Sequence, residues 1–292
     1  MLRVSLATFI LWNLVEVITF RGTYEPTPDP PRQKIFIAST HWNNEVAIRS
    51  YWNWALLDLV KYFGVEDVYV SIYESGSWDD SKGALRVLDK ELDRLGVRRT
   101  IILDPTTHAD EIAKPPTASG WIDTPRGKKE LRRISYLSGL RNLSLRPLEK
   151  LEEVGVLFDK LLFLNDVVFT VSLHLEVFAV KTTYASQTED VIKLLDTNNG
   201  QYAAACAMDY SKPPNYYDTF ALRDADGEET VMQTWPYFRS RTSRSAIKSN
   251  KPVPVTSCWN GMGKIRSPSL SNLSSLSNLF TLTLDVSSPT SL

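Results

Sequence analysis

The sequence predicts an α/β protein with a mostly parallel sheet and helices on both of its faces. Short apolar segments alternate with helical ones along the chain, which is the pattern of βαβ units. The strongest segment, 158–170, is apolar and interrupted once, by Asn165-Asp166, as expected of a strand buried on both faces. Every polar cluster follows the end of a predicted strand, so we expect a ligand at the edge where the strand ends meet.

Composition limits the classes of protein. The chain has 292 residues, 43% hydrophobic and 23% charged, enough for one large core with appendages. With a net charge of -1 and no long basic stretch, nothing in the composition points to a nucleic-acid surface. Two cysteines, Cys206 and Cys258, allow one disulfide but do not demand it.

The N-terminal residues 1–20 are mostly apolar and fit a signal peptide, a membrane anchor or a helix packed on the domain. Asn13 and Glu16 disfavour a membrane-spanning helix. Residues 21–33 are rich in proline and predict an extended stem.

The first strands are predicted at 34–40, 67–73 and 99–103. The first ends in Ser39 and Thr40, and the polar turn that follows contains Asn44. The second leads into a loop, 74–82, that begins with Glu74 and ends with Lys82. Leucines at helical spacing over 85–95, and aromatic residues over 51–63, predict the helices between the strands.

The middle of the chain offers a cationic and an acidic candidate. A loop over 113–128 precedes a predicted basic helix that starts at Lys128 and runs towards Leu148. Its Arg132 and Arg133 fit a clamp on phosphate or, equally, a solvated helix face. Asn165 and Asp166 end the central strand, where they fit a divalent cation and a nucleotide diphosphate, or a simple polar transition into a loop.

Further along, a helix is predicted over 188–196 and a strand of small residues over 202–209, which ends in Asp209. Aromatic residues then alternate with Asp, Arg and Asn over 213–224, 233–240 and 253–262. Such segments line sugar sites, although loop packing explains the aromatic residues as well.

Five segments together resemble the fungal capsule-associated α-1,3-mannosyltransferase family, glycosyltransferase family 69. They are IASTHWNNE at 37–45, ESGSWDD at 74–80, LNDV at 164–167, YDTFALRD at 217–224 and SCWNGM at 257–262. The resemblance covers residues 34–262, and the order of several long motifs makes it specific.

The resemblance implies a GT-A-like fold and a type II membrane enzyme of the Golgi or secretory pathway. It implies transfer of mannose from GDP-mannose to the 3-hydroxyl of a mannose-containing acceptor, with retention of the α configuration. A divalent cation, Mn or Mg, is implied with Asp166 as its ligand, although the second carboxylate usual in such motifs is missing. Asp224 is the expected catalytic carboxylate, and Arg223 beside it orients donor or acceptor. The expected substrate-binding residues are Ser39, Thr40, Asn44, Glu74, Lys82, Arg132, Arg133, Asn165, Asp209, Trp259 and Asn260.

Two segments depart from the family pattern. Residues 171–187 interrupt it and fit a translated intron, since Val-Ser and Gln can be encoded by splice-site consensus sequences. Residues 263–292 are rich in Ser and Leu and fit a disordered read-through tail or a short lineage-specific one. If both are aberrant, this chain is inactive, and the alternative function is a non-catalytic glycan- or nucleotide-binding protein of the secretory pathway.

Overall fold

The computed structural model describes residues 32–116, 120–165, 191, 194–200, 202–207, 210–212, 215–217, 219, 222–249, 251–257 and 262–264. All of them belong to the compact unit that begins at Arg32. The predicted N-terminal segment 1–20, the stem up to Pro31, the segment 171–187 and the tail from residue 265 lie outside the described residues.

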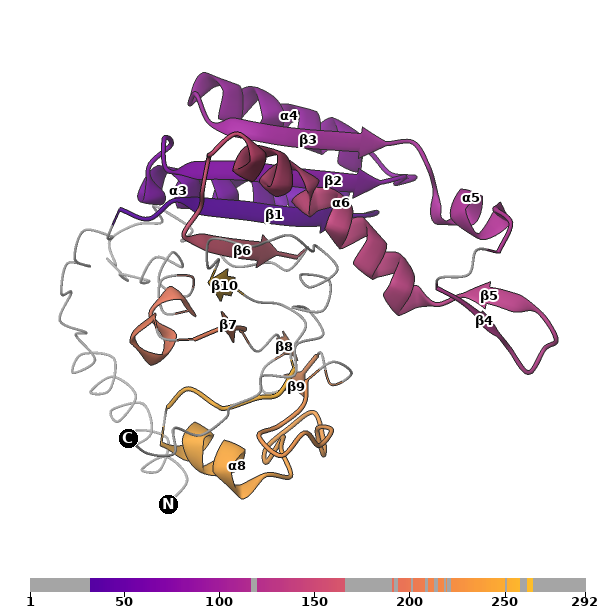
Figure 1. Cartoon of the computed structure of the whole chain (residues 1–292), viewed down its shortest axis with the longest axis vertical. Coiled ribbons are helices and arrows are strands. Elements are labelled where there is room, and N and C mark those ends of the chain that lie inside the picture. The colour runs from indigo at the N-terminus through magenta and orange to yellow at the C-terminus, as the bar shows by residue number, and fades with distance from the viewer. Residues whose placement is uncertain are drawn as a thin grey trace, which may run out of the picture. The chain divides into compact units, whose positions relative to one another are not determined.

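Strands and helices alternate through the first half of the chain (Figure 1). In chain order the elements are β1 (Ile35–His41), α2 (Glu45–Ala47), the π-helix η1 (Ile48–Trp52), α3 (Asn53–Phe63), β2 (Val68–Ser75), α4 (Ser81–Arg94), β3 (Arg98–Asp104), α5 (His108–Ala113), β4 (Trp121–Asp123), β5 (Lys129–Leu131), α6 (Arg133–Glu153), β6 (Lys160–Leu164), the 3-10 helix η2 (Thr197–Gly200), β7 (Ala204–Ala205), β8 (Tyr210–Lys212), β9 (Asn215–Tyr216), α8 (Arg241–Lys248) and β10 (Met262–Lys264).

The central sheet has the strand order β3-β2-β1-β6-β10-β7. Neighbouring strands within β3-β2-β1-β6 pair in parallel, whereas β10 lies antiparallel to both β6 and β7. The mixed α/β class predicted from the sequence is therefore confirmed.

Helices cover both faces of the sheet because successive strand residues point to opposite faces. In β1, Ile35 and Ile37 pack in a core with leucines of α3 and α4, whereas Phe36 and Ala38 pack in a second core with Leu145 of α6. All five residues of β6 are buried, which confirms the central strand as one buried on both faces.

Three of the predicted strands are confirmed with ends shifted by one or two residues, and the leucine-rich helix is α4. The predicted start of the basic helix at Lys128 is wrong. Residues Lys129–Leu131 instead form β5, which pairs with β4, and α6 begins at Arg133. The hairpin depends on a turn closed by a 2.9 Å hydrogen bond from Gly127 N to Thr124 O, with Pro125 in its second position.

The predicted strand over 202–209 is shorter than expected, since β7 comprises Ala204 and Ala205 only. At its far end the predicted domain stops at residue 262, yet Gly263 and Lys264 continue as β10 within the central sheet. Cys206, next to β7, is disulfide-bonded, and the other cysteine of the chain, Cys258, lies outside the described residues.

Candidate functional site

The carboxyl ends of β1, β2, β3 and β6 meet at one edge of the sheet because the four strands are parallel. Along the chain, β2 and then β3 are added on one side of β1, and β6 is added on the other. The direction of winding therefore reverses between β1 and β6. Open α/β sheets bind ligands at such a switch point, so this edge is the candidate site.

Thr40 and Asn165 lie at the carboxyl ends of the two strands that flank the switch point. Ser39 is paired with Leu164 in the sheet register, so the next residues along, Thr40 and Asn165, lie at the same level. Thr40 is half-buried, and its hydroxyl has no hydrogen-bond partner in the described part of the chain. It is the strand-end hydroxyl that is available to a ligand.

His41, the last residue of β1, is buried between two side chains. Its Nδ1 lies 2.9 Å from Asn44 Nδ2, and its Nε2 lies 2.9 Å from Ser39 Oγ. Because the Asn44 amide donates to Nδ1, the ring proton sits on Nε2 and is donated to the Ser39 hydroxyl. Burial disfavours the charged ring and lowers the pKa of His41 to about 3.

Trp52 connects the ends of β1 and β6. Its indole packs edge-on against His41 with ring centroids 4.4 Å apart, and its Nε1 donates to the carbonyl oxygen of Asn165 at 3.1 Å. On the other face of the sheet, Arg141 of α6 donates to Asn165 Oδ1 at 3.1 Å and lies 4.7 Å from the centre of the Phe163 ring. Both the backbone and the side chain of Asn165 are thereby held in place.

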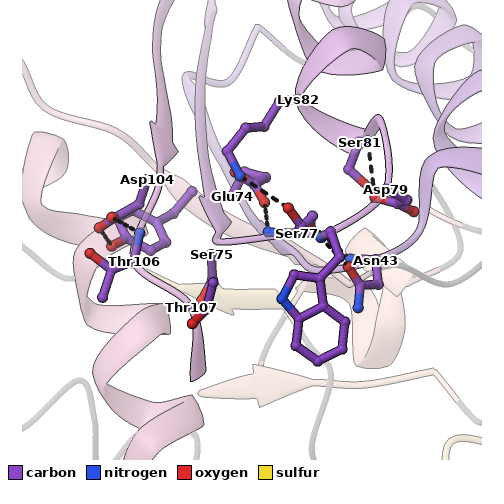
Figure 2. A network of polar contacts seen from close by, with 12 residues as sticks. Asn43, Glu74, Ser75, Ser77, Asp79, Ser81, Lys82, Asp104, Thr106 and Thr107 are labelled. Carbon is purple, nitrogen blue, oxygen red and sulfur yellow. Dashed lines mark hydrogen bonds and ion pairs between the residues drawn. The ribbon is translucent and has the colours of Figure 1, made fainter. Parts of the chain in front are cut away.

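At the end of β2, Glu74 is fully buried and its carboxylate is paired on both sides (Figure 2). Lys82 Nζ, from the first turn of α4, lies 2.8 Å from Glu74 Oε2, and Ser77 N donates to Oε1 at 2.6 Å. This ion pair closes the loop after β2 onto the helix that follows it.

The loop after β1 and the loop after β2 are bonded to each other. Three successive backbone amides of the first loop donate to side chains of the second: Asn43 N to Ser77 Oγ, Asn44 N to Ser81 Oγ and Glu45 N to Asp79 Oδ2, at 2.8, 3.0 and 2.9 Å. In return, Trp78 N donates to Asn43 Oδ1 at 2.7 Å. The amides at the start of the first helix are therefore not available to an anionic ligand.

Gly76 allows the loop after β2 to lie against the loop after β3. It has a φ of +58°, and a Cβ atom at this position would lie 2.2 Å from the backbone oxygen of Thr106. Only glycine fits both the left-handed conformation and the close approach.

The end of β3 is also fixed by internal bonds. Asp104 accepts hydrogen bonds from the Tyr73 hydroxyl and, at 2.7 Å, from Thr106 N. Burial raises the pKa of Asp104, but these hydrogen bonds outweigh it and the net pKa is lowered.

Arg132 and Arg133 lie beyond the carboxyl edge because α6 runs antiparallel to the strands. Tyr136 Oη lies 3.0 Å from Ser75 Oγ, while Ser71 Oγ donates to the carbonyl oxygen of Ser144 at 2.6 Å. The eight residues from Tyr136 to Ser144 rise about 12 Å along the helix, and the four from Ser71 to Ser75 rise about 13 Å along the strand. The two lengths match, so the helix and the strand lie side by side in opposite directions. The helix therefore begins about 4.5 Å beyond Ser75. Both guanidinium groups are exposed and, within the described residues, unpaired.

Arg223 and Asp224 lie in a second region, residues 215–257, which has its own small core of Tyr216, Leu222, Tyr237 and Phe238. Asp224 is fully buried and accepts backbone hydrogen bonds from Asp226, Glu228 and Ser240 at 3.0, 3.0 and 2.7 Å. Arg223 lies 3.2 Å from the carboxylate of Glu229. Asp224 thus organises this region, and its catalytic role stays a prediction.

Asp166, Asp209, Trp259 and Asn260 lie outside the described residues. Within the described part no group of three or more His, Cys, Asp and Glu side chains is arranged to hold a metal ion. Asn165 Oδ1 accepts from a guanidinium, whose positive charge opposes a cation at the same oxygen. The described residues therefore do not by themselves form a metal centre.

The structure places Thr40, Asn44, Glu74, Lys82 and Asn165 at one edge of the sheet, as the sequence predicts, but the sequence did not show how they are connected. It also missed His41, Trp52 and Arg141. A signal for Arg141 was present, because it precedes the buried Leu145 and Leu148 by four and seven residues. It therefore lies on the face of α6 that packs on the sheet.

The fold and this edge define a class: an α/β protein whose parallel strands have a switch point between β1 and β6. The chain belongs to the family whose model is described as Cryptococcal mannosyltransferase 1, which matches residues 34–275. This confirms the family resemblance inferred from the five motifs and supports a glycosyltransferase role, with a sugar donor and a glycan acceptor. The match extends past the predicted domain end at residue 262. No curated protein matched the chain.

Proposed function

We propose that the chain transfers mannose from GDP-mannose to the 3-hydroxyl of an acceptor mannoside, with retention of the α configuration, on a GT-A-like fold. The family supports a mannosyltransferase. The observation that carries the proposal is the switch point between β1 and β6, with Thr40 and Asn165 at the two strand ends.

In this proposal the diphosphate of the donor lies above the carboxyl edge. The Thr40 hydroxyl donates to a phosphate oxygen, and Arg132 and Arg133 approach the same group from the start of α6. Guanidinium groups suit this position because they bind phosphate through two parallel hydrogen bonds. The paired loops after β1 and β2 shape this edge rather than bind the anion.

The reaction exchanges one bond at C1 of the mannosyl group for another. The bond from C1 to the diphosphate oxygen breaks and its electron pair leaves with GDP. A bond forms from C1 to the 3-oxygen of the acceptor, whose proton passes to the departing diphosphate oxygen. Negative charge grows on the departing diphosphate, so cations placed there in advance lower the barrier. Asp224 and Arg223 remain proposed contributors at the reacting carbon.

A divalent cation stays part of the proposal through Asp166 alone, and no step above depends on it. A cation held there would neutralise charge on the diphosphate. Comparison of GDP-mannose turnover with manganese, with magnesium and with a chelator tests this. Asp166→Ala abolishes turnover if the proposal is correct.

The proposed location is the secretory pathway or Golgi. The disulfide at Cys206 supports it, because structural disulfides form in oxidising compartments. No helix within the described residues is long and apolar enough to span a membrane. Whether residues 1–20 anchor the protein is tested by carbonate extraction of membranes from cells that produce the full chain.

The decisive experiment measures GDP-mannose binding by calorimetry and GDP release in the presence of a mannose disaccharide. Thr40→Val removes the available hydroxyl and keeps the branched shape, so we expect about tenfold weaker GDP-mannose binding. The matched control is Thr242→Val, an exposed threonine on α8. Unchanged binding by Thr40→Val would refute the donor position. Binding without GDP release would instead favour the non-catalytic alternative.

A further inference from the structure

A second candidate site lies beside α8, in the region of residues 215–257. A pocket of about 540 Å³ is lined by Trp235, Pro236, Arg241, Arg244, Ser245 and Lys248. Arg241, Arg244 and Lys248 are three and four residues apart, so their side chains share one face of the helix. None of the lining residues takes part in the carboxyl-edge site described above.

The pocket carries positive charge that the described residues do not balance. No acidic side chain lines it, and within the described part of the chain no ion pair involves its three cations. Arg244 and Lys248 are four residues apart on α8, a spacing at which like charges destabilise a helix. An anion bound between them would remove this repulsion.

An aromatic ring also lines the pocket. Trp235 keeps 44% of its surface exposed, although Tyr237 and Phe238, which follow it closely, are buried in the small core. Lys248 Nζ lies 5.4 Å from the centre of the Trp235 ring, so charge and ring face the same space. Exposed tryptophan faces suit the C–H faces of sugars.

The walls of the pocket are fixed by internal hydrogen bonds. The buried Asp224 accepts from Ser240 N at 2.7 Å, and Ser240 caps α8 through a 3.4 Å bond from Ser243 N. Ser243 Oγ in turn donates to the carbonyl oxygen of Pro254 at 3.2 Å. The start of α8 is therefore held in place before any ligand arrives, which lowers the entropic cost of binding.

We propose that this pocket binds an anionic carbohydrate. The sugar ring packs on Trp235, and its phosphate or carboxylate group lies between the side chains of Arg241, Arg244 and Lys248. The site is separate from the proposed donor site, and its binding does not depend on transferase activity.

The test uses the full chain labelled with 5-fluorotryptophan and observed by fluorine NMR. The chain has eight tryptophans, and Trp235→Phe assigns the resonance that reports on this pocket. The probes are mannose 1-phosphate, galacturonate, mannose and inorganic phosphate. We expect a saturable shift of the Trp235 resonance with at least one of the two anionic sugars. The sugar that produces the shift shows whether the pocket binds a phosphate or a carboxylate.

Arg244→Ala should weaken that binding about tenfold, because a hydrogen bond to a charged group is lost. The matched control is Arg86→Ala, an exposed arginine on α4 that should leave the titration unchanged. The proposal is overturned if neither anionic sugar shifts Trp235, if mannose or inorganic phosphate alone binds equally well, or if Arg244→Ala binds as the wild type does. GDP-mannose binding, measured in the same samples, reports separately on the donor site.

Discussion

The carboxyl edge of the sheet and the α8 pocket are both rich in charged side chains, but they use charge differently. At the edge, Glu74 is paired with Lys82, and Arg49 lies 2.8 Å from the carboxylate of Glu45. In the α8 pocket, three cations face a tryptophan and no acid lines the space. The loops of the first region pair their own charges, whereas the second region has charge left for a ligand.

This difference shows that a polar side chain at a strand end is not by itself a ligand contact. Glu74 and Lys82 stabilise the loop that follows β2 at this edge. Thr40 and the exposed Arg132 and Arg133 are unpaired within the described residues, so they remain for a ligand. Stability measurements separate the two kinds of charge.

The largest effect is expected for Lys82→Met. This substitution leaves the fully buried Glu74 carboxylate without its cation, and breaking a buried pair in this way costs about 3 kcal/mol or more. Urea unfolding measures the change in the free energy of unfolding.

Two further variants test the cause of that loss. Lys90→Met, an exposed lysine of the same helix, should change stability by less than about 0.5 kcal/mol. The double variant Glu74→Gln/Lys82→Met should recover much of the loss, because no unpaired buried charge remains. If it is as unstable as Lys82→Met, the ion pair is not the cause.

Gly76→Ala should cost about 2–3 kcal/mol, because it combines a left-handed backbone with a clash at 2.2 Å against the Thr106 carbonyl oxygen. Gly96→Ala is the matched control, since Gly96 has a φ of +74° and nothing within 4 Å of the added Cβ. It should cost only about 1 kcal/mol, the strain alone. Thermal unfolding of the two variants separates the clash from the strain, and equal losses would argue against the close contact between the loops.

His41 makes the stability of the edge depend on pH. Its pKa is lowered from 6.5 to about 3 on folding. Below about pH 6.5 the unfolded chain therefore binds a proton that the folded chain does not bind. The contribution of the neutral His41 ring to the free energy of unfolding is complete above pH 6.5 and is lost as the pH falls towards 3. Between pH 7 and pH 5 the loss amounts to about 2 kcal/mol.

The measurement compares urea unfolding at the two pH values for wild type and His41→Gln, which lacks a titrating group. The wild type should lose about 2 kcal/mol more than the variant on acidification. His108→Gln, a half-buried histidine of α5, is the control and should behave as the wild type does. A His41→Gln profile parallel to that of the wild type would show that burial of this ring does not control the pH dependence.

The sequence predicted most of the sheet because long apolar segments such as β6 carry their own signal. It did not predict the β4–β5 hairpin, whose strands have only three residues each and contain charged ones. It also placed the domain boundary inside β10, since the pairing of β10 with β6 joins segments about a hundred residues apart. Short strands of this kind depend on tertiary contacts more than on local pattern.

For the site, the sequence located the edge but not the pairing of its charges. Glu74 and Lys82 are separated by a turn and lie on different elements, so nothing local shows that one neutralises the other. Asp224 remains a predicted carboxylate at the reacting carbon, and its three backbone partners give it in addition a structural role that residue type alone does not reveal.

The smallest stability effect is expected in the α8 pocket, and it completes the comparison. Lys248→Met removes a cation that has no acidic partner among the described residues and lies four residues from Arg244. The substitution relieves the repulsion between Lys248 and Arg244 but also removes the cation–π contact of Lys248 with Trp235. The two effects oppose each other, so the free energy of unfolding should change by less than about 0.5 kcal/mol. The same kind of substitution at Lys82 costs several times more. A large loss for Lys248→Met would mean that this lysine, too, stabilises the fold, and that the pocket's charge is not kept for a ligand.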